Sequence, residues 1–476
     1  MFAKAENLEQ VAACVTLEPL VSGDPRYVDI SKGRDTKELR RLEMHLQDAD
    51  ASQNRYAQVA FTGHRGCGKS TELLKLEHNL SGRFTCLHLY LDDNLLRDCD
   101  YTDLTLWLVD SLVRKFAEWK MPLDTGLVDD VIGWFAEKTL EEVNSVKSEL
   151  TVEAEAKGEA KAGFYWLSLK LLARVKSALV GSVERRKVIR QTLQSYSSDL
   201  LSRVNLLLDN AQQTLEKYGK TPDLLIVQDN LDRLPVEIGR RLFFDNGDLL
   251  KSLRAHVIYT VPIAMVLAPW NINRVFSHTF TMQMVKTHNR DNQPFTLGMN
   301  ALVELVAQRV QVDSIFTSVE EVRYLARMSG GSVRDLMRLV DYAQLSARVD
   351  EKTRIDHASA QDAVKKIRLD FERLLIPGQV LIGPLGVVFE LAVEVIEAGE
   401  APGEAFFQGG IEAAAVGECI QESDETVRAL RAKECHQLLG FLVKNRNLRD
   451  FVWVGRHGSE GGDGDVIRGR QHRRMG

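Results

Sequence analysis

Short apolar segments recur along this chain, separated by longer stretches in which apolar residues lie three or four positions apart. Each short segment predicts a strand, and four consecutive apolar residues, as at Leu224–Val227, suit a strand buried on both faces of a parallel sheet. Strands that alternate with helices predict an α/β fold with a sheet covered on both faces. The predicted strands are residues 56–61, 84–91, 224–229, 256–261 and 281–285.

The helical spacing predicts helices at residues 37–47, 70–80 and 102–119, and one long helix over 184–220. Residues 153–163 (EAEAKGEAKAG) alternate as a strand would, have a helix-forming composition, and contain glycines that favour neither. From residue 297 to residue 376 every segment has a helical pattern.

The pattern changes after residue 376. Helices are predicted at 385–396 and 422–439, and apolar runs at 441–443 and 448–454 flank a basic turn, as in a hairpin. A helix followed by a basic hairpin is typical of a winged helix, and a small packing domain fits the same pattern. Residues 458–476 are rich in Gly, Arg and Asp, and predict a disordered tail.

A glycine-rich segment joins the first predicted strand to the helix at 70–80. It matches G-x-x-x-x-G-K-[ST], and its residues are Gly63, His64, Arg65, Gly66, Cys67, Gly68, Lys69, Ser70 and Thr71. Between a strand and a helix, this pattern predicts a phosphate site in which backbone N–H groups and the helix N-terminus face the anion. Lys69 is expected to reach the β- and γ-phosphates, and the Ser70 hydroxyl to bind Mg²⁺.

Asp229 ends the predicted strand at 224–229, at the edge where open α/β sheets bind ligands. A carboxylate at this place can hold Mg²⁺, usually through water. Alone, Asp229 could equally be a surface residue that ends a strand, but beside a phosphate loop we interpret it as a metal ligand.

Composition adds few constraints. The chain has 476 residues, a net charge of −6 and six cysteines without a C-x-x-C pair. These features predict several domains, no overall bias toward nucleic acid, and a reducing compartment without structural zinc. The first nine residues do not resemble a signal peptide, and no stretch approaches the roughly 18 apolar residues of a membrane helix. We therefore expect a cytoplasmic protein without membrane contact.

These segments together resemble the AAA+/STAND superfamily of P-loop ATPases, nearest to the origin-recognition-like branch and to bacterial P-loop ATPase fold proteins. The resemblance covers about residues 20–375. It rests on YVD at 27–29, GHRGCGKST at 63–71, IVQDNLDR at 226–233, a strand that ends in Thr260, and GGSVRDL at 330–336.

The resemblance implies roles for individual residues. Tyr27 and Val28 would flank the adenine of ATP, Thr260 would act as sensor 1 at the γ-phosphate, and Arg334 would act as sensor 2, which couples a helical lid to the nucleotide. Most relatives carry Asp-Glu at the strand end, whereas Asn230 follows Asp229 here. Asp232 could take the role of the water-activating base, so slow hydrolysis is expected.

The arginine finger that such enzymes supply from a neighbouring subunit is not assigned. Arg274 lies at about the right place in the sequence, before the strand at 281–285, and a surface arginine is an equally good interpretation of it.

The expected division is a lead-in at 1–55, ATPase core halves at 56–120 and 221–294, a helical insertion at 121–220, a helical lid at 295–376, a C-terminal module at 377–457, and the tail. The expected function is an ATP- and Mg²⁺-dependent switch that assembles with itself or activates a protein effector, in prokaryotic antiphage defence. The alternative is a DNA-binding initiator or loader that contacts DNA through residues 424–450. A metabolic or transport NTPase is a weaker third interpretation.

Overall fold

The computed structural model describes residues 2–49, 55–91, 96–140, 143–156, 163–180, 183–268 and 270–374. Its strands are β1 (Gln58–Gly63), β2 (Thr85–Tyr90), β3 (Leu224–Asp229), β4 (His256–Thr260) and β5 (Thr279–Met282). The helices up to β3 are α1 (Leu8–Cys14), α2 (Ser31–Arg34), α3 (Glu38–Gln47), α4 (Lys69–Asn79), α6 (Tyr101–Glu118), α7 (Thr125–Thr139), α8 (Val143–Ala156), α9 (Gly163–Val180), α10 (Val183–Ser195) and α11 (Ser197–Lys217). Those after β3 are η3 (Leu231–Arg233), α12 (Val236–Arg240), η4 (Arg241–Asp245), α13 (Gly247–Lys251), α14 (Ile263–Leu267), η5 (Ile272–Arg274), α15 (Thr296–Ala307), α16 (Val312–Ile315), α17 (Val319–Met328), α18 (Val333–Val349) and α19 (His357–Leu374).

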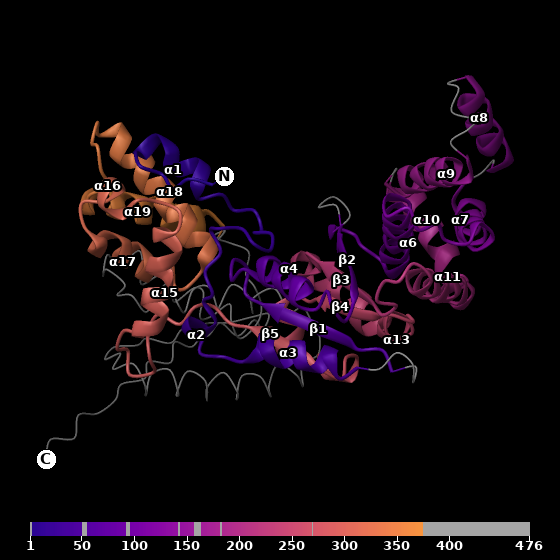
Figure 1. The fold of residues 1–476 in the computed structure, drawn as a ribbon, viewed down its shortest axis with the longest axis horizontal. Coiled ribbons are helices and arrows are strands. Elements are labelled where there is room, and N and C mark those ends of the chain that lie inside the picture. Colours follow the sequence, from indigo (N-terminus) through magenta and orange to yellow (C-terminus); the bar gives the residue numbers. More distant parts are fainter. Residues whose placement is uncertain are drawn as a thin grey trace, which may run out of the picture. The chain divides into compact units, whose positions relative to one another are not determined.

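The five strands form one sheet in the order β2-β3-β4-β1-β5, and every pairing is parallel (Figure 1). The α/β class and the parallel sheet are therefore confirmed. The register aligns Tyr90 with Asp229, and Phe61 with Thr260. The carboxyl ends of β1, β3 and β4 thus meet at one edge, with β4 between the strand that leads into the glycine-rich loop and the strand that ends in Asp229.

Both faces of the sheet are buried, as its apolar strands require. Alternate residues of one strand, such as Val59 and Ala60, belong to different hydrophobic clusters. One cluster joins the sheet to α3 and α4, and the other joins it to the helices between β2 and β3 and to those that follow β3. The helices between the two halves of the sheet therefore share its core.

The long helix expected over 184–220 is two helices. The chain breaks at Tyr196, whose φ of −121° and ψ of 27° are not helical, so that α10 ends at Ser195 and α11 begins at Ser197. Ile189 and Leu193 of α10 are buried, as are Leu200 and Val204 of α11. The break changes the helix direction, and each segment can then turn its own apolar stripe into the core.

The helices from α15 to α19 pack around a separate cluster, which we call the lid. Helix α1 lies against α18 and contributes Leu8, Val11 and Cys14 to the lid cluster (Figure 1). The sequence pattern placed residues 1–55 in a lead-in and did not predict this packing. The N-terminal helix is thus part of the lid, although it precedes the sheet in sequence.

The chain passes between the lid and the sheet twice, and the two crossings lie side by side. The backbone N–H of Lys286 donates to the Gly33 carbonyl at 2.9 Å, and the Lys286 ammonium pairs with Asp35 at 2.9 Å. Arg34 donates to the Gln283 carbonyl at 2.5 Å. These bonds join α2 and Asp35, the residue that follows it, to residues 283–286, which follow β5. We call this pair of segments the double crossing.

Stability should fall when the protein is acidified, because His256 is buried as a neutral base. Its Nδ1 accepts the Ala57 N–H at 3.0 Å, and burial, aided by the charge of Arg83, lowers its pKa from 6.5 to about 4. Between these two values the unfolded chain binds a proton that the folded chain does not. The free energy of unfolding should therefore fall from pH 6.5 to pH 4, by up to roughly 3 kcal/mol.

Denaturant unfolding at several pH values would measure this slope. His256→Gln keeps a hydrogen-bond acceptor but cannot titrate, so its slope in this window should be smaller than that of the wild type. An identical slope in both proteins would contradict the assignment.

Among the helices of the described residues, none combines the length and the apolar character that crossing a membrane requires.

Candidate functional site

The glycine-rich loop runs from the end of β1 to the start of α4, as predicted. Gly66 and Gly68 have φ values of 90° and 95°, which side-chain-bearing residues rarely adopt. A Cβ at Gly66 would also lie 2.6 Å from the Ser332 hydroxyl oxygen of the lid. Position 66 therefore requires glycine for two reasons: the backbone conformation of the turn and the close approach of the lid.

Lys69 folds back over the loop that precedes it. Its ammonium donates to the carbonyls of Gly63 at 2.7 Å and His64 at 3.0 Å, and it pairs with Asp232 at 2.9 Å. The Lys69 side chain is only 6% exposed. An anion at this ammonium would compete with Asp232, which is itself only partly buried.

The end of β3 brings Asp229 against the first turn of α4. Asp229 is 1% exposed, accepts the Asn230 N–H at 2.7 Å, and is hydrogen-bonded to the Ser70 side chain. Burial would raise the pKa of Asp229, but hydrogen bonds from His88 and Ser70 outweigh it and lower the pKa. A hydroxyl and an ionised carboxylate side by side are the oxygen donors that Mg²⁺ prefers, so this pair fits the ion.

His88 of β2 was not predicted and lies behind Asp229. Its Nε2 is 3.4 Å from the Asp229 carboxylate, and its Nδ1 is hydrogen-bonded to Glu77 of α4. Burial disfavours the protonated ring, but these two carboxylates outweigh burial and raise the His88 pKa to about 9. The only sequence signal for His88 is its position in β2, the strand that pairs with β3 and so lies beside Asp229.

Asn230 follows Asp229, and its side chain bonds backbone groups at the end of β2. The amide accepts the Leu91 N–H at 3.1 Å and donates to the Leu91 carbonyl at 2.7 Å, at a φ of 61° that asparagine tolerates. It thus extends the pairing of β2 and β3 beyond their ends. Asp232, in the turn η3, is the nearby carboxylate that lines the cavity described next.

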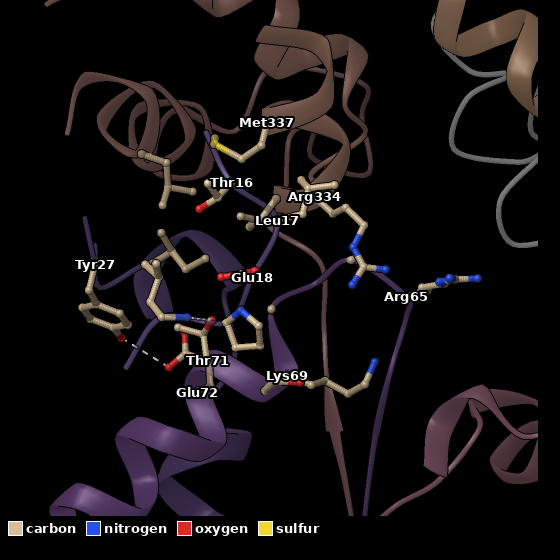
Figure 2. Close-up of a pocket in the computed structure, with 18 of the residues that line it drawn as sticks. Thr16, Leu17, Glu18, Tyr27, Arg65, Lys69, Thr71, Glu72, Arg334 and Met337 are labelled. Carbon is tan, nitrogen blue, oxygen red and sulfur yellow. Dashed lines mark hydrogen bonds between the residues drawn. The ribbon is translucent and has the colours of Figure 1, made fainter. Parts of the chain in front are cut away.

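A cavity lies over the carboxyl edge of the sheet, between the loop and the lid (Figure 2). Arg65 and Lys69 enter it from the loop and Arg334 from the first turn of α18. Of the predicted site residues, Tyr27, Val28, Arg65, Gly66, Gly68, Lys69, Ser70, Thr71, Asp232 and Arg334 line it. Gly63, His64, Cys67, Asp229 and Thr260 are not among the lining residues, although Asp229 bonds Ser70, which is.

The lid rests directly on the loop. The Arg334 N–H donates to the Gly66 carbonyl at 3.2 Å, and Ser332 caps α18 by accepting the Asp335 N–H at 3.2 Å. The predicted helix start at Ser332 is therefore correct. Arg334 lines the same cavity as the loop.

Thr260 ends β4 between the two functional strand ends, but it does not face the cavity. It is fully buried, its hydroxyl donates to the Gln228 carbonyl at 3.1 Å, and it accepts the Leu231 N–H at 3.0 Å. Buried hydroxyl groups usually form hydrogen bonds with nearby backbone groups. In this arrangement Thr260 holds the turn that carries Asp232 and makes no contact with the cavity.

Tyr27 and Val28 also line the cavity, as do apolar residues such as Leu305 and Met337, and Tyr27 lies on the side away from Arg65 and Lys69 (Figure 2). The Tyr27 hydroxyl donates to Glu72 at 3.2 Å (Figure 2). It also accepts from Lys75 at 2.7 Å. This side could cover an aromatic base, whereas the side at Lys69 could bind an anion.

Arg34 was also missed by the sequence analysis. It is 2% exposed, donates to the Cys67 carbonyl at 2.7 Å, and lies 3.7 Å from Glu72. This hydrogen bond from a charged donor fixes the position of the Cys67 carbonyl within the glycine-rich loop. Arg34 belongs to the double crossing, so this crossing also supports the loop.

Arg274 is exposed and lies in η5, outside the cavity lining. The neighbouring Asn273 accepts a hydrogen bond from Thr279 at the amino end of β5, which is the opposite edge of the sheet from the loop. The predicted C-terminal module (377–457), its DNA-contacting segment (424–450) and the tail (458–476) lie outside the described residues.

No protein-family model matches the chain, and no curated protein matches it. Solved structures similar to it include Drosophila ORC bound to DNA, with 12% identity, a TM-score of 0.40, and 93% of this chain and 85% of that chain covered. The ORC2 protein of Aeropyrum pernix, in ADPNP–ADP complexes, has 11% identity and a TM-score of 0.43, with 89% of each chain covered. A Walker-type ATPase of Pyrococcus abyssi has 10% identity and a TM-score of 0.41, with 91% of this chain and 93% of that chain covered. At TM-scores of 0.40–0.43 these similarities support no conclusion about function.

Proposed function

We propose that this chain binds and slowly hydrolyses ATP, and that the nucleotide controls how its lid meets the glycine-rich loop. The observation that carries the proposal is one cavity lined both by Lys69 of the loop and by Arg334 of the lid. A triphosphate at this place would be attracted by cations from two packing units of the chain. Its binding free energy would then favour the closed arrangement over the open one.

In this proposal the loop N–H groups and Lys69 bind the β- and γ-phosphates, and Tyr27 and Val28 flank the base. Ser70 and Asp229 would hold Mg²⁺, which supplies positive charge to the phosphate oxygens when it is bound. His88 keeps the Asp229 carboxylate oriented through its hydrogen bond. Asp232, released from Lys69 by the incoming phosphate, orients the attacking water and accepts its proton.

The consequence we propose for ATP binding is assembly of the chain with itself or activation of an effector protein, in prokaryotic antiphage defence as the resemblance implies. Thr260 contributes as a positioning residue for the Asp232 turn. Arg334 senses the terminal phosphate and transmits its presence to α18.

Assembly is tested by light scattering after size exclusion, with and without ATP and Mg²⁺. We expect the wild type to form a larger species with ATP and Lys69→Ala to keep the mass of the nucleotide-free protein. If ATP binds to the wild type but the mass does not change, the assembly part of the proposal is wrong, and the nucleotide acts within one chain or on another protein.

A further inference from the structure

Arg65 and Arg233 line the cavity and have no role in the function proposed so far. Arg65 is in the glycine-rich loop, and Arg233 follows Asp232 in η3. Both line the cavity, as do Lys69 at the start of α4 and Arg334 in the first turn of α18. We call Arg65, Arg233 and Arg334 the arginine cluster.

Each member of the arginine cluster has a fixed contact at the residue itself or at its neighbour in sequence. Arg334 donates its own N–H to Gly66, the residue after Arg65, at 3.2 Å. The Arg334 Cβ lies only 3.1 Å from the place of a Cβ on Gly66. Arg233 follows Asp232, whose carboxylate lies 2.9 Å from the Lys69 ammonium. These contacts therefore join the loop to the lid, and η3 to the start of α4, next to the three arginines.

The cluster carries more positive than negative charge. Burial lowers the pKa of Arg334, and the charges of Arg65 and Arg233 lower it further, against Asp232 and Asp335. Asp232 is already paired with Lys69. Like charges held together raise the free energy of the site, and an anion with several charges would relieve that repulsion.

We propose that Arg65 and Arg233, with Arg334, neutralise the terminal phosphate within one chain, so that hydrolysis needs no arginine from a second chain. This inference rests on the proposed ATPase function. A water oxygen forms a bond to the γ-phosphorus as the bond from that phosphorus to the β–γ bridging oxygen breaks. The electron pair of the broken bond stays on the β-phosphate, the proton of the water passes to Asp232, and the products are ADP and inorganic phosphate. The three guanidinium groups stabilise the charge that builds up on the phosphate oxygens.

Arg274 is the residue that the competing arrangement would use. It lies beside the amino end of β5, whereas the cavity lies at the carboxyl edge of the sheet. Within one chain it does not line the cavity, so it could reach a terminal phosphate only in a neighbouring chain. The two arrangements therefore predict opposite results when Arg65, Arg233 and Arg274 are replaced one at a time.

The test uses the full chain, with the ATPase rate and the affinities for ATP and ADP measured for each variant. Arg65→Ala and Arg233→Ala should each lower kcat by at least about tenfold. Their ADP affinity should remain near that of the wild type, since ADP lacks the terminal phosphate. Parallel losses of ADP affinity and thermal stability would instead indicate a structural role and overturn the inference. Arg41→Ala, which removes an exposed pair with Glu38 on α3, serves as the control.

A mixing experiment separates action within a chain from action between chains. Arg65→Ala and Lys69→Ala are co-expressed, so that one variant keeps an intact nucleotide site and the other keeps Arg65. We expect the activity of the mixture to equal the sum of its parts. Restored activity, or an inactive Arg274→Ala beside active Arg65→Ala and Arg233→Ala, would overturn the inference. A wild type that binds no ATP would instead reject the proposed function itself.

Discussion

Lys69→Ala should bind ATP about ten- to a hundredfold more weakly than the wild type and hydrolyse it at least about a hundredfold more slowly. Hydrogen bonds to charged groups contribute about 1.5–3 kcal/mol, which gives the loss in affinity. The loss in rate is larger because a positioned donor stabilises the transition state more than the bound substrate. Titration with a fluorescent ATP analogue and a phosphate-release assay would measure the two effects.

The matched control is Lys115→Ala. Lys115 is a half-exposed lysine that pairs with Glu118 at 3.1 Å on the surface of α6 and does not line the cavity. Its removal tests the general effect of losing one positive charge. Near-wild-type ATP affinity in Lys69→Ala would show that the loop does not bind phosphate in the way we propose.

Asp232→Asn should lower kcat by roughly a hundredfold or more, the usual contribution of a general base. The affinity for ATP should stay constant or rise, because Lys69 loses the carboxylate with which it is paired at 2.9 Å. Single-turnover hydrolysis and equilibrium binding measure these quantities separately. The expected result is therefore a large loss of rate without a loss of affinity.

The alternative is that Asp232 serves only as the counter-ion of Lys69. In that case Asp232→Asn would bind ATP more tightly without losing kcat. Asp335→Asn provides the control. Like Asp232, Asp335 is an acidic residue next in sequence to an arginine of the cavity, but it pairs with Arg338 at 3.3 Å and does not line the cavity. It should leave kcat close to the wild-type value.

The sequence predicts the loop and the strand ends well because their signals are local. The glycines at 63, 66 and 68 allow the backbone conformation of the loop, and the apolar run before Asp229 predicts a buried strand. Neither signal depends on distant parts of the chain. The parallel sheet then brings Asp229 to Ser70. The prediction was less successful at Thr260, where the strand end is correct but the hydroxyl bonds backbone groups and does not reach the cavity.

The residues missed by the sequence analysis all act over long sequence separations. Arg34 bonds Cys67 and Gln283, and His88 bonds Asp229. A single arginine or histidine on a strand or short helix carries no pattern that reveals such partners. The packing of α1 in the lid also depends on residues far away in the sequence. The spacing of its apolar residues indicates that one face is buried, but it does not indicate which helix covers that face.

The double crossing has a consequence for how the lid can move. Two covalent connections that lie side by side and share hydrogen bonds allow rotation about their common line, but they oppose sliding and separation. Chain connectivity would then set the direction of lid motion, and the nucleotide would set only its extent. Because Arg34 ties this hinge to the Cys67 carbonyl, a turn of the lid would also pull on the glycine-rich loop. Phosphate binding and lid angle would thus be mechanically linked through Arg34 and the Cys67 carbonyl, as well as through Lys69 and Arg334.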